Sequence, residues 1–328
     1  MAVISMGADA AAAALPSDLR HRLAATVELE PDLIAPDPPA PYAPDALART
    51  EILLTGWGTP PLDATALDRA PRLRAVVHAA GSVKQHLSPE VWERGIAVSS
   101  AADANAAPVA DFTCAAITLA AKRALSSAAR YETGRPSLAD RQGADGRTIG
   151  IIGASRIGRL VIARLAAHDA EFRILLTDPY LSTADAQALG TELVSPDELC
   201  RRSSIVSIHA PQLPETHHLL NAHRLSLIPD GGTVINTARG SLVDTDALTR
   251  ECATGRLDAC LDVTDPDPLP AGHPLLALRN VLVTPHIAGA QGSEVRRLGA
   301  YAVAEVERLV HGRPLLGRVT AADLPRMA

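Results

Sequence analysis

The feature that most constrains this chain is an alternation of short apolar runs with longer amphipathic stretches. Each run is flanked by Gly, Pro, Asp or Ser and is followed by a helical pattern, as buried strands are in βαβ units. Strands of this kind form parallel sheets covered by helices. The runs are ILL (52–54), AVV (75–77), IGII (149–152), ILL (174–176), IVSI (205–208), TVIN (233–236), ACLDV (259–263) and VLV (281–283). The sequence therefore predicts an α/β fold.

Two long helical patterns divide the chain. The first follows AADANAAP, with Pro108 expected in its opening turn, and continues as VADFTCAAITLAAKRAL, which is apolar on nearly all sides. The second begins at Ser293 and ends before Gly312. A length of 328 residues favours two domains. We therefore expect a nucleotide-binding domain at 109–292, inserted into a smaller domain formed by 1–108 and 293–328.

The stretch TIGIIGASRIGRL (148–160) has the pattern of a strand, a tight turn and a helix that hold a dinucleotide pyrophosphate. Gly153 suits the turn and Gly158 suits close packing of the helix on the sheet, but Ser155 replaces the middle glycine of G-x-G-x-x-G. A serine is small, and its hydroxyl can cap the helix or donate to a phosphate. We therefore expect that Ser155 permits binding. A degenerate turn without a ligand is the alternative.

An acidic residue lies at the position that selects the cofactor. Asp178 ends the next apolar run, 20 residues after Gly158. At that spacing a carboxylate binds the ribose hydroxyls of NAD and repels the 2′-phosphate of NADP. The sequence therefore predicts NAD as the cofactor.

Charge and composition narrow the partners. A net charge of -6 and a pI near 6.0 give no basic footprint, so nucleic acid is not expected. The four cysteines form no C-x-x-C pair and are expected to be small buried residues in a reducing compartment. No apolar run approaches the roughly 18 residues of a membrane span, and the N-terminus lacks the basic region of a signal peptide. We expect a soluble cytoplasmic protein without a membrane partner.

Four further motifs follow the turn: SIHAPQLPETHHLLN (207–221), GGTVINTARGSLVDTDAL (231–248), LDVTDPDPLP (261–270) and TPHIAG (284–289). In this order and spacing the chain resembles the D-isomer specific 2-hydroxyacid dehydrogenases, which include phosphoglycerate, glyoxylate/hydroxypyruvate and D-lactate dehydrogenases. The resemblance covers about residues 75–300. It implies two doubly wound parallel-sheet domains, a Rossmann NAD-binding domain and a smaller flavodoxin-like substrate domain, which close around a cleft in a homodimer. It also implies hydride transfer between NAD(H) and a small D-2-hydroxy or 2-oxo acid.

The resemblance assigns three catalytic residues. Arg239 matches the arginine that pairs with the substrate carboxylate and polarises the 2-oxo group, a task suited to a planar guanidinium. His286 matches the histidine that gives a proton to the carbonyl oxygen and takes it back in oxidation. Asp267 stands where the family has a glutamate that pairs with this histidine. Because aspartate is one methylene shorter, either the backbone moves in or the contact loosens, and we expect a more acidic optimum for reduction.

The same resemblance assigns binding residues. Asp262 matches the aspartate near the nicotinamide carboxamide, and the loop HAAGS matches the loop whose backbone N–H groups hold the substrate carboxylate. The predicted substrate-binding residues are Ala80, Gly81, Ser82, Arg239 and His286. The predicted cofactor-binding residues are Gly153, Ser155, Arg156, Ile157, Gly158, Asp178, His209, Ala210, Pro211, Thr216, Thr237, Ala238, Arg239, Asp262, His286 and Gly289.

Two alternatives stand beside this interpretation. The same fold also serves as a non-catalytic, NAD-sensing corepressor, and related scaffolds oxidise formate or phosphite. Formate dehydrogenases pair the histidine with glutamine, which Asp267 is not. The adjacent His217 and His218 are expected to be solvated rather than metal ligands, so no metal site is predicted.

Overall fold

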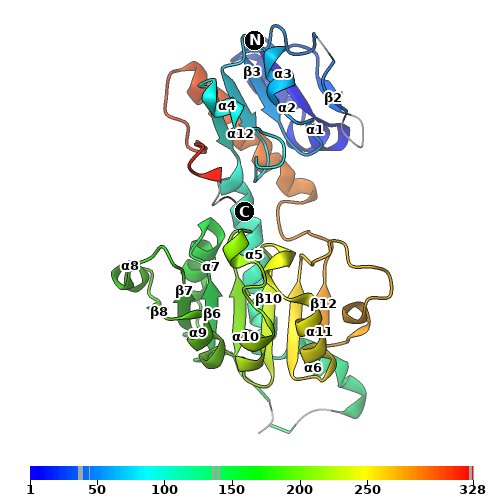
Figure 1. The fold of residues 1–328 in the computed structure, drawn as a ribbon, viewed down its shortest axis with the longest axis vertical. Coiled ribbons are helices and arrows are strands. Elements are labelled where there is room, and N and C mark those ends of the chain that lie inside the picture. The colour runs from blue at the N-terminus through cyan, green and yellow to red at the C-terminus, as the bar shows by residue number, and fades with distance from the viewer. Residues whose placement is uncertain (36–39, 44, 135–136, 139–140, 325–326, 328) are drawn as a thin grey trace. The chain divides into compact units, whose positions relative to one another are not determined.

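The computed structural model describes residues 1–35, 40–43, 45–134, 137–138, 141–324 and 327, and it divides into two compact units. Unit 1 comprises Met1–Ala106 and Ala290–Met327, and unit 2 comprises Ala107–Gly289 (Figure 1). The domain limits expected from the sequence, 108/109 and 292/293, lie within a few residues of these divisions. The first division falls inside helix α5 (Ala102–Ala121).

Unit 2 is built on a parallel sheet of seven strands in the order β12-β11-β10-β9-β6-β7-β8 (Figure 1). The chain enters this sheet at β6, runs outward to β8, returns to β9 on the other side of β6 and then runs outward to β12. The reversal between β6 and β9 is the switch point at which doubly wound sheets bind their ligands. The strands are β6 (Thr148–Ile152), β7 (Arg173–Thr177), β8 (Glu192–Leu193), β9 (Ile205–Ile208), β10 (Gly232–Asn236), β11 (Leu257–Leu261) and β12 (Val281–Val283).

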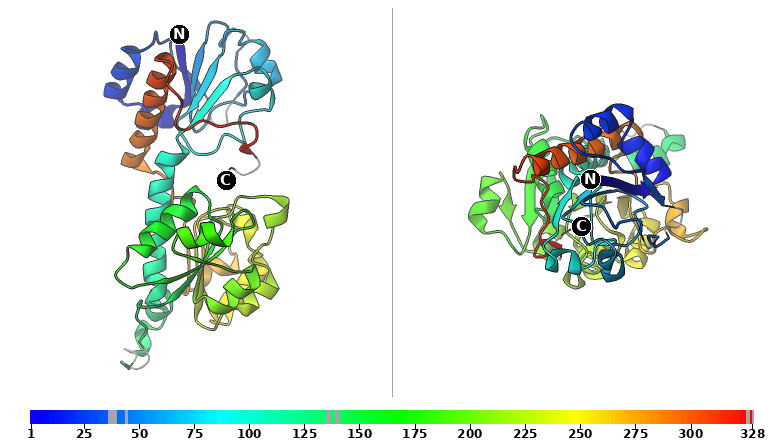
Figure 2. Two further views of the ribbon diagram at one scale, coloured as in Figure 1. Left: turned by 90° about the vertical axis from the view of Figure 1, so that its left-hand side faces the viewer. Right: turned by 90° about the horizontal axis from the view of Figure 1, so that it is seen from above.

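Alternating apolar side chains cover both faces of this sheet. Ile149 and Ile151 pack in the cluster that contains residues of α5, α7 (Arg156–Ala166) and α8 (Thr183–Ala188). Ile152 packs in the cluster that contains residues of α9 (Pro196–Arg202), α10 (Ala222–Leu227) and α11 (Thr245–Ala253). Helices accordingly lie on both sides of the sheet (Figure 2). The short helix α6 (Ala124–Ala129) follows α5.

Unit 1 is built on a smaller parallel sheet of five strands in the order β2-β1-β3-β4-β5. Helices α1 (Ala8–Ala14), α2 (Ser17–Ala24) and α12 (Val295–Val310) pack on one face, and α3 (Ala64–Asp68) and α4 (Glu90–Glu93) pack on the other. The strands are β1 (Ala2–Gly7), β2 (Leu33–Ala35), β3 (Ile52–Thr55), β4 (Ala75–His78) and β5 (Ala97–Ser100). This strand order is that of flavodoxin-like domains. The predicted fold class, two doubly wound α/β sheets, is confirmed.

All eight apolar runs form strands, but four strands were not predicted. β2 and β8 are only three and two residues long. β1 and β5 contain buried serines, which break the apolar pattern. Ser5 lies 3.0 Å from the Tyr42 hydroxyl, and Ser99 donates to the Glu305 carboxylate at 2.6 Å. Because these hydrogen bonds satisfy the hydroxyls, polar residues occupy interior strand positions.

Pro108 lies inside α5 and not in its opening turn, which corrects the prediction. The helix begins at Ala102, whose N–H donates to the Ser100 hydroxyl at 3.2 Å, and alanine-rich residues continue it. Because proline has no N–H, it leaves one carbonyl of the preceding turn without its helical partner. The second long helix, α12, begins at Val295 after a short 3-10 turn, Gly292–Glu294, rather than at Ser293.

Within the part of the chain that the structure describes, α5 has the length and the apolar composition of a membrane span. Asp103 and Asp111 interrupt its apolar residues, which is why no contiguous run revealed it. Half of its apolar stretch is buried inside the protein. Buried core helices have the same composition, so α5 is weak evidence for a membrane.

Candidate active site

The predicted cofactor residues of unit 2 follow the carboxyl ends of neighbouring strands. Gly153 follows β6, Asp178 follows β7, His209 follows β9, Thr237 follows β10 and Asp262 follows β11. Because parallel strands place their carboxyl ends at one edge of the sheet, these residues lie along the edge that contains the switch point. The sheet topology therefore places the predicted site where doubly wound folds bind nucleotides.

The turn after β6 has no room for side chains at its two glycines. Gly153 has a φ of +95°, and a Cβ there would lie 2.8 Å from the backbone nitrogen of Ala210. A Cβ at Gly158 would lie 2.2 Å from the carbonyl oxygen of Gly153. These approaches give the physical reason for both glycines, a tight turn and close packing of α7 on the sheet. A cradle of bare backbone at a helix N-terminus fits a pyrophosphate.

Ser155 is the N-cap of α7. Its Oγ accepts a hydrogen bond from the N–H of Gly158 at 3.3 Å. The hydroxyl proton is not used by this cap and can be donated to another acceptor. The capping role that a serine offers is therefore present, and the phosphate contact stays a prediction.

Asp178 is fixed against the same turn. One carboxylate oxygen accepts from the N–H of Ala154 at 2.8 Å, and the other accepts from the N–H of Tyr180 at 2.9 Å. Each oxygen keeps a further lone pair for a hydroxyl donor. The fixed negative charge suits a ribose and opposes a phosphate in the same place.

His209 and the loop after it follow β9, the strand next to β6, at the same edge of the sheet. The His209 N–H donates to the Ile152 carbonyl at 2.7 Å, and its buried ring lies 2.9 Å from the Ser207 hydroxyl. Burial lowers the pKa of His209 to about 3, so the ring is neutral at pH 7. The Thr216 hydroxyl donates to the Pro211 carbonyl at 2.7 Å and closes the loop. Of the other predicted cofactor residues, Arg156 and Ile157 begin α7, Ala210 follows His209, and Gly289 ends unit 2.

Asn236, which was not predicted, shapes the loop that carries Arg239. Its side chain accepts from the N–H of Ala238 at 3.0 Å and donates to the carbonyl of Arg239 at 2.8 Å. Thr237 in the same loop lies 2.8 Å from the hydroxyl of Thr113 on α5. The loop is therefore tied both to itself and to the helix behind it.

Arg239 carries an unneutralised charge. Its Nη1 donates to the carbonyl of Ala238 at 2.6 Å, and none of the described carboxylates forms an ion pair with its guanidinium. The side chain is partly buried, and burial lowers its pKa, yet an arginine keeps its proton at any physiological pH. The result is a desolvated cation that can receive an anionic ligand.

Asp262 organises the loop after β12. Its buried carboxylate accepts from the Thr284 hydroxyl at 2.7 Å and from the N–H groups of Ile287 and Ala288, both at 2.8 Å. The N–H of His286 donates to the Asp262 carbonyl at 3.0 Å. This positioning of the His286 loop was not predicted, and the contact of Asp262 with the nicotinamide stays a prediction.

His286 and Asp267 are brought together, but loosely. His286 Nδ1 lies 3.7 Å from Asp267 Oδ2, and the two side chains are 57% and 46% exposed. That distance suits an ion pair but exceeds the roughly 3.2 Å limit of a good hydrogen bond. It corresponds to the looser of the two arrangements expected for the shorter aspartate. His286 also has a φ of +57°, which turns the backbone sharply at this position.

The predicted substrate residues of unit 1 lie in the loop after β4. Ala80 is buried, a Cβ at Gly81 would lie 3.4 Å from Asn105 Nδ2, and the Ser82 hydroxyl accepts from the Lys84 N–H at 3.4 Å. Their binding of a substrate carboxylate stays a prediction.

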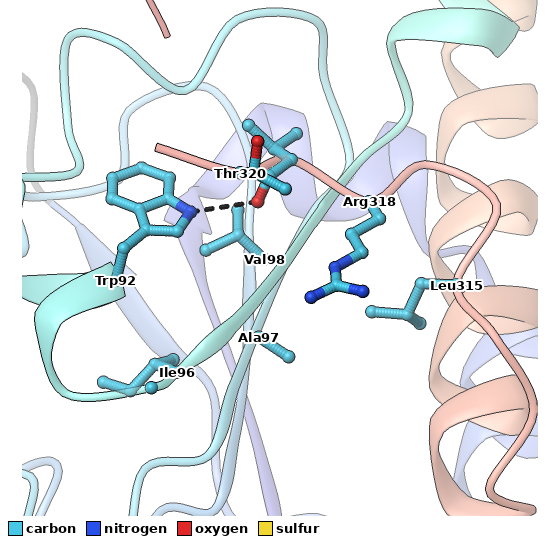
Figure 3. Close-up of a pocket in the computed structure, with 9 residues that line it drawn as sticks. Trp92, Ile96, Ala97, Val98, Leu315, Arg318 and Thr320 are labelled. Atoms are coloured by element: carbon cyan, nitrogen blue, oxygen red, sulfur yellow. Dashed lines mark hydrogen bonds between the residues drawn. The ribbon is translucent and has the colours of Figure 1, made fainter. Parts of the chain in front are cut away.

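A pocket of about 340 Å³ in unit 1 contains none of the predicted site residues (Figure 3). It lies between β5 and the chain segment near residues 315–320, where Trp92 Nε1 donates to the Val319 carbonyl at 2.9 Å. Arg318 carries the charge among its lining residues, which include no carboxylate or histidine. This pocket therefore lacks an acid–base pair.

Comparison with known proteins gives the matched family. A sequence model described as "D-isomer specific 2-hydroxyacid dehydrogenase, NAD binding domain" matches residues 114–288. This range contains the turn after β6 together with Arg239, Asp267 and His286. NAD is therefore the cofactor of the matched domain.

Curated relatives match most of the chain. A D-3-phosphoglycerate dehydrogenase of Methanocaldococcus jannaschii is 31% identical over 265 residues, which are 79% of this chain and 50% of that protein. A glyoxylate reductase of Thermofilum pendens is 33% identical over 263 residues, which are 77% of each chain. The chain thus spans about half the length of the phosphoglycerate dehydrogenases that it matches.

Solved structures match nearly the whole chain. A Thermus thermophilus protein shares 32% identity at a TM-score of 0.75, covering 98% of this chain and 100% of that one. The D-lactate dehydrogenase of Aquifex aeolicus, described as complexed with NAD and lactic acid, shares 25% identity at a TM-score of 0.71. That match covers 95% of this chain and 96% of the other.

Proposed function

The chain belongs to the D-isomer specific 2-hydroxyacid dehydrogenases, and from that membership we propose that it transfers a hydride between NAD(H) and a small 2-oxo or D-2-hydroxy acid. The observation that carries the proposal is the Arg239 guanidinium, partly buried and without a carboxylate partner among the described residues. A desolvated cation is unfavourable until an anion neutralises it. A 2-oxo acid supplies such an anion.

Arg239 has two roles in this proposal. Its planar fork holds the substrate carboxylate through paired hydrogen bonds, and its charge polarises the 2-oxo group. Bound NADH supplies the hydride, and NAD accepts it in the reverse direction. As negative charge develops on the substrate oxygen, the fixed cation stabilises it.

His286 moves the proton. In reduction its imidazolium donates to the carbonyl oxygen, and in oxidation the neutral ring takes the proton from the hydroxyl. Its side chain is 57% exposed, so the ring is accessible to a small substrate. Asp267, at 3.7 Å, faces the ring at ion-pair distance rather than through a short hydrogen bond.

The turn after β6 binds the dinucleotide in this proposal. The turn at Gly153 and the N-terminus of α7 would hold the pyrophosphate, and Asp178 would bind the adenosine ribose. The loops that carry His209, Thr216 and Thr237 line the rest of the cofactor.

The deciding experiment is a panel of 2-oxo acids, including glyoxylate, hydroxypyruvate and pyruvate, assayed with NADH by loss of its absorbance. We expect saturable oxidation of NADH with at least one acid. Binding of NADH without turnover of any acid would instead favour the NAD-sensing alternative. Reduction of NAD by formate or phosphite, with no reaction of the 2-oxo acids, would favour the formate or phosphite dehydrogenase alternative.

We also propose that the chain forms a homodimer in a reducing, cytoplasmic compartment. Leu119 of α5 and Leu282 of β12 are apolar yet 50% and 36% exposed, and they line one small depression of unit 2. All four cysteines are free, and burial raises the pKa of each to about 11 or 12, so the thiols are unreactive. Light scattering that gives the mass of a monomer would contradict the dimer.

A further inference from the structure

Three potential metal ligands of unit 2 meet outside the proposed acid–base pair. One ligand atom from each of His217, His218 and Asp265 lies within 4.8 Å of the other two. In the described parts of the chain, neither imidazole nor this carboxylate forms a hydrogen bond or an ion pair with another side chain. We propose that these three residues bind a divalent transition-metal ion of the zinc class.

The backbone at His218 places two consecutive imidazoles on the same side. Neighbouring side chains of an extended chain point in opposite directions. His218, however, has a φ of +48°, and the two rings stack with their centroids 3.9 Å apart and their planes 24° apart. A left-handed residue that is not glycine is uncommon and points to a local function. Here it aligns two ring nitrogens with one carboxylate.

Both ligand-bearing segments are anchored to a third segment. The His218 N–H donates to the Ser241 carbonyl at 2.8 Å, and the Thr245 hydroxyl donates to the Asp265 carbonyl at 2.8 Å. These bonds use backbone atoms of the two ligand residues. The ligand atoms themselves stay available on a fixed frame, as a preorganised site requires.

The donor set selects the class of ion. Two imidazole nitrogens and one carboxylate oxygen suit zinc and its neighbours, whereas Mg²⁺ and Ca²⁺ prefer oxygen donors alone. Zinc bonds of about 2.1 Å in a tetrahedron place ligand atoms roughly 3.4 Å apart. Because His217 and Asp265 are exposed, their side chains can rotate over the remaining distance. The fourth position is left for water.

The position of the site connects two loops of the proposed enzyme. Thr216, which directly precedes His217, closes the predicted cofactor loop, and Asp265 lies two residues before Asp267. A bound ion therefore links the cofactor loop to the loop of the acid–base pair. The inference does not depend on the proposed function, because metal binding is measured without turnover.

The test uses tag-free protein that has been stripped with a chelator and dialysed. It is titrated with Co²⁺ alone, followed by the visible absorption of four-coordinate cobalt, and with Zn²⁺ alone, followed by calorimetry. We expect one ion per chain and a higher Tm with Zn²⁺. His217→Ala and Asp265→Asn should each weaken binding at least tenfold. His218→Asn should do the same while keeping a residue that tolerates positive φ.

His223→Ala is the matched control, because His223 is an exposed histidine of the same unit that contacts Asp197 at 3.3 Å. It should bind Zn²⁺ as the unaltered chain does. The proposal would be overturned if the unaltered chain did not bind one ion per chain. It would also be overturned if all three ligand variants bound Zn²⁺ as tightly as the unaltered chain does. Because His217 and Asp265 are exposed, either variant decides the result if the other fails to fold.

Discussion

The turn after β6 and the loops after β11 and β12 differ in how firmly they hold their functional groups. In the turn, Asp178 accepts two hydrogen bonds at 2.8 and 2.9 Å, and Gly158 leaves no room even for a methyl group. In the loops, His286 and Asp267 are 3.7 Å apart and about half exposed. The part proposed to bind the cofactor is therefore preformed. The part proposed to move the proton relies on charge at a longer distance.

The largest expected effect separates the turn proposed to bind the cofactor from the loops proposed to move the proton. Arg239→Ala and His286→Asn should each lower kcat/KM at least about a hundredfold, or 2.7 kcal/mol, because each removes a group that acts on the developing charge or the proton. Asparagine is chosen at His286 because it tolerates a φ of +57°. Steady-state kinetics and a fluorescence titration with NADH measure the two effects. Retained activity in either variant would refute the assignment, and an equal loss of NADH binding would show that the parts are not separable.

The next effect concerns His209, the buried histidine that follows β9 in the predicted cofactor site. The pKa of His209 is lowered to about 3 in the folded chain, so its contribution to stability is full above about pH 6.5 and is lost as the pH falls toward 3. Between pH 6.5 and 5 this loss amounts to about 1.6 kcal/mol. His209→Gln should remove that part of the pH dependence in urea unfolding. The two proteins share all other histidines, so the contributions of those residues cancel when the two pH dependences are subtracted. Equal slopes of unfolding free energy against pH in the two proteins would contradict the prediction.

A smaller effect tests the fixed carboxylate of the turn. Because Asp178 opposes a 2′-phosphate, NADH should be preferred over NADPH at least about tenfold in kcat/KM, or 1.4 kcal/mol. Asp178→Asn should narrow this ratio, mainly through KM. Equal kcat/KM values for NADH and NADPH in the unaltered chain would show that Asp178 does not face the ribose.

A still smaller effect probes the loose pair. Asp267→Glu should bring a carboxylate closer to His286 and keep or raise kcat/KM for reduction, whereas Asp267→Asn removes the charge and should lower it. Steady-state kinetics of 2-oxo acid reduction measure both effects. If kcat/KM is unchanged in both variants, Asp267 does not act on His286.

The smallest effect concerns the helix cap. Ser155→Gly should leave kcat unchanged and keep or slightly improve NADH binding, because glycine at an N-cap costs only a few tenths of a kcal/mol relative to serine. The measurement is the Kd for NADH. A loss of binding greater than tenfold would mean that the hydroxyl is a phosphate ligand as well as a cap.

Much of the fold was predictable because the buried strands are apolar and bounded by turn residues. β1 and β5 were missed because Ser5 and Ser99 are satisfied by partners far along the chain. Pro108 was misplaced because the start of α5 depends on a cap by Ser100 and on alanine content rather than on the proline. The missed strands have a distant cause, since a pattern of single residues does not show hydrogen bonds to partners far along the chain, whereas the error at Pro108 was local.

The sequence motifs name the candidate site residues but not the contacts that support them. Motif order predicted Arg239, Asp267 and His286. The hydrogen bonds of Asn236 within its loop, and those of Asp262 to the His286 loop, depend on how the chain turns after each strand. The meeting of His217 and His218 with Asp265 likewise depends on loops that are distant in sequence.

The position of Asp178 also bears on how this lineage can change coenzyme. The carboxylate that would discriminate between NAD and NADP is the same one that fastens the backbone of Ala154 and Tyr180. A substitution that admits a phosphate therefore also removes or changes an acceptor of the turn's backbone N–H groups. Redesign for NADPH should therefore retain an acceptor for those N–H groups.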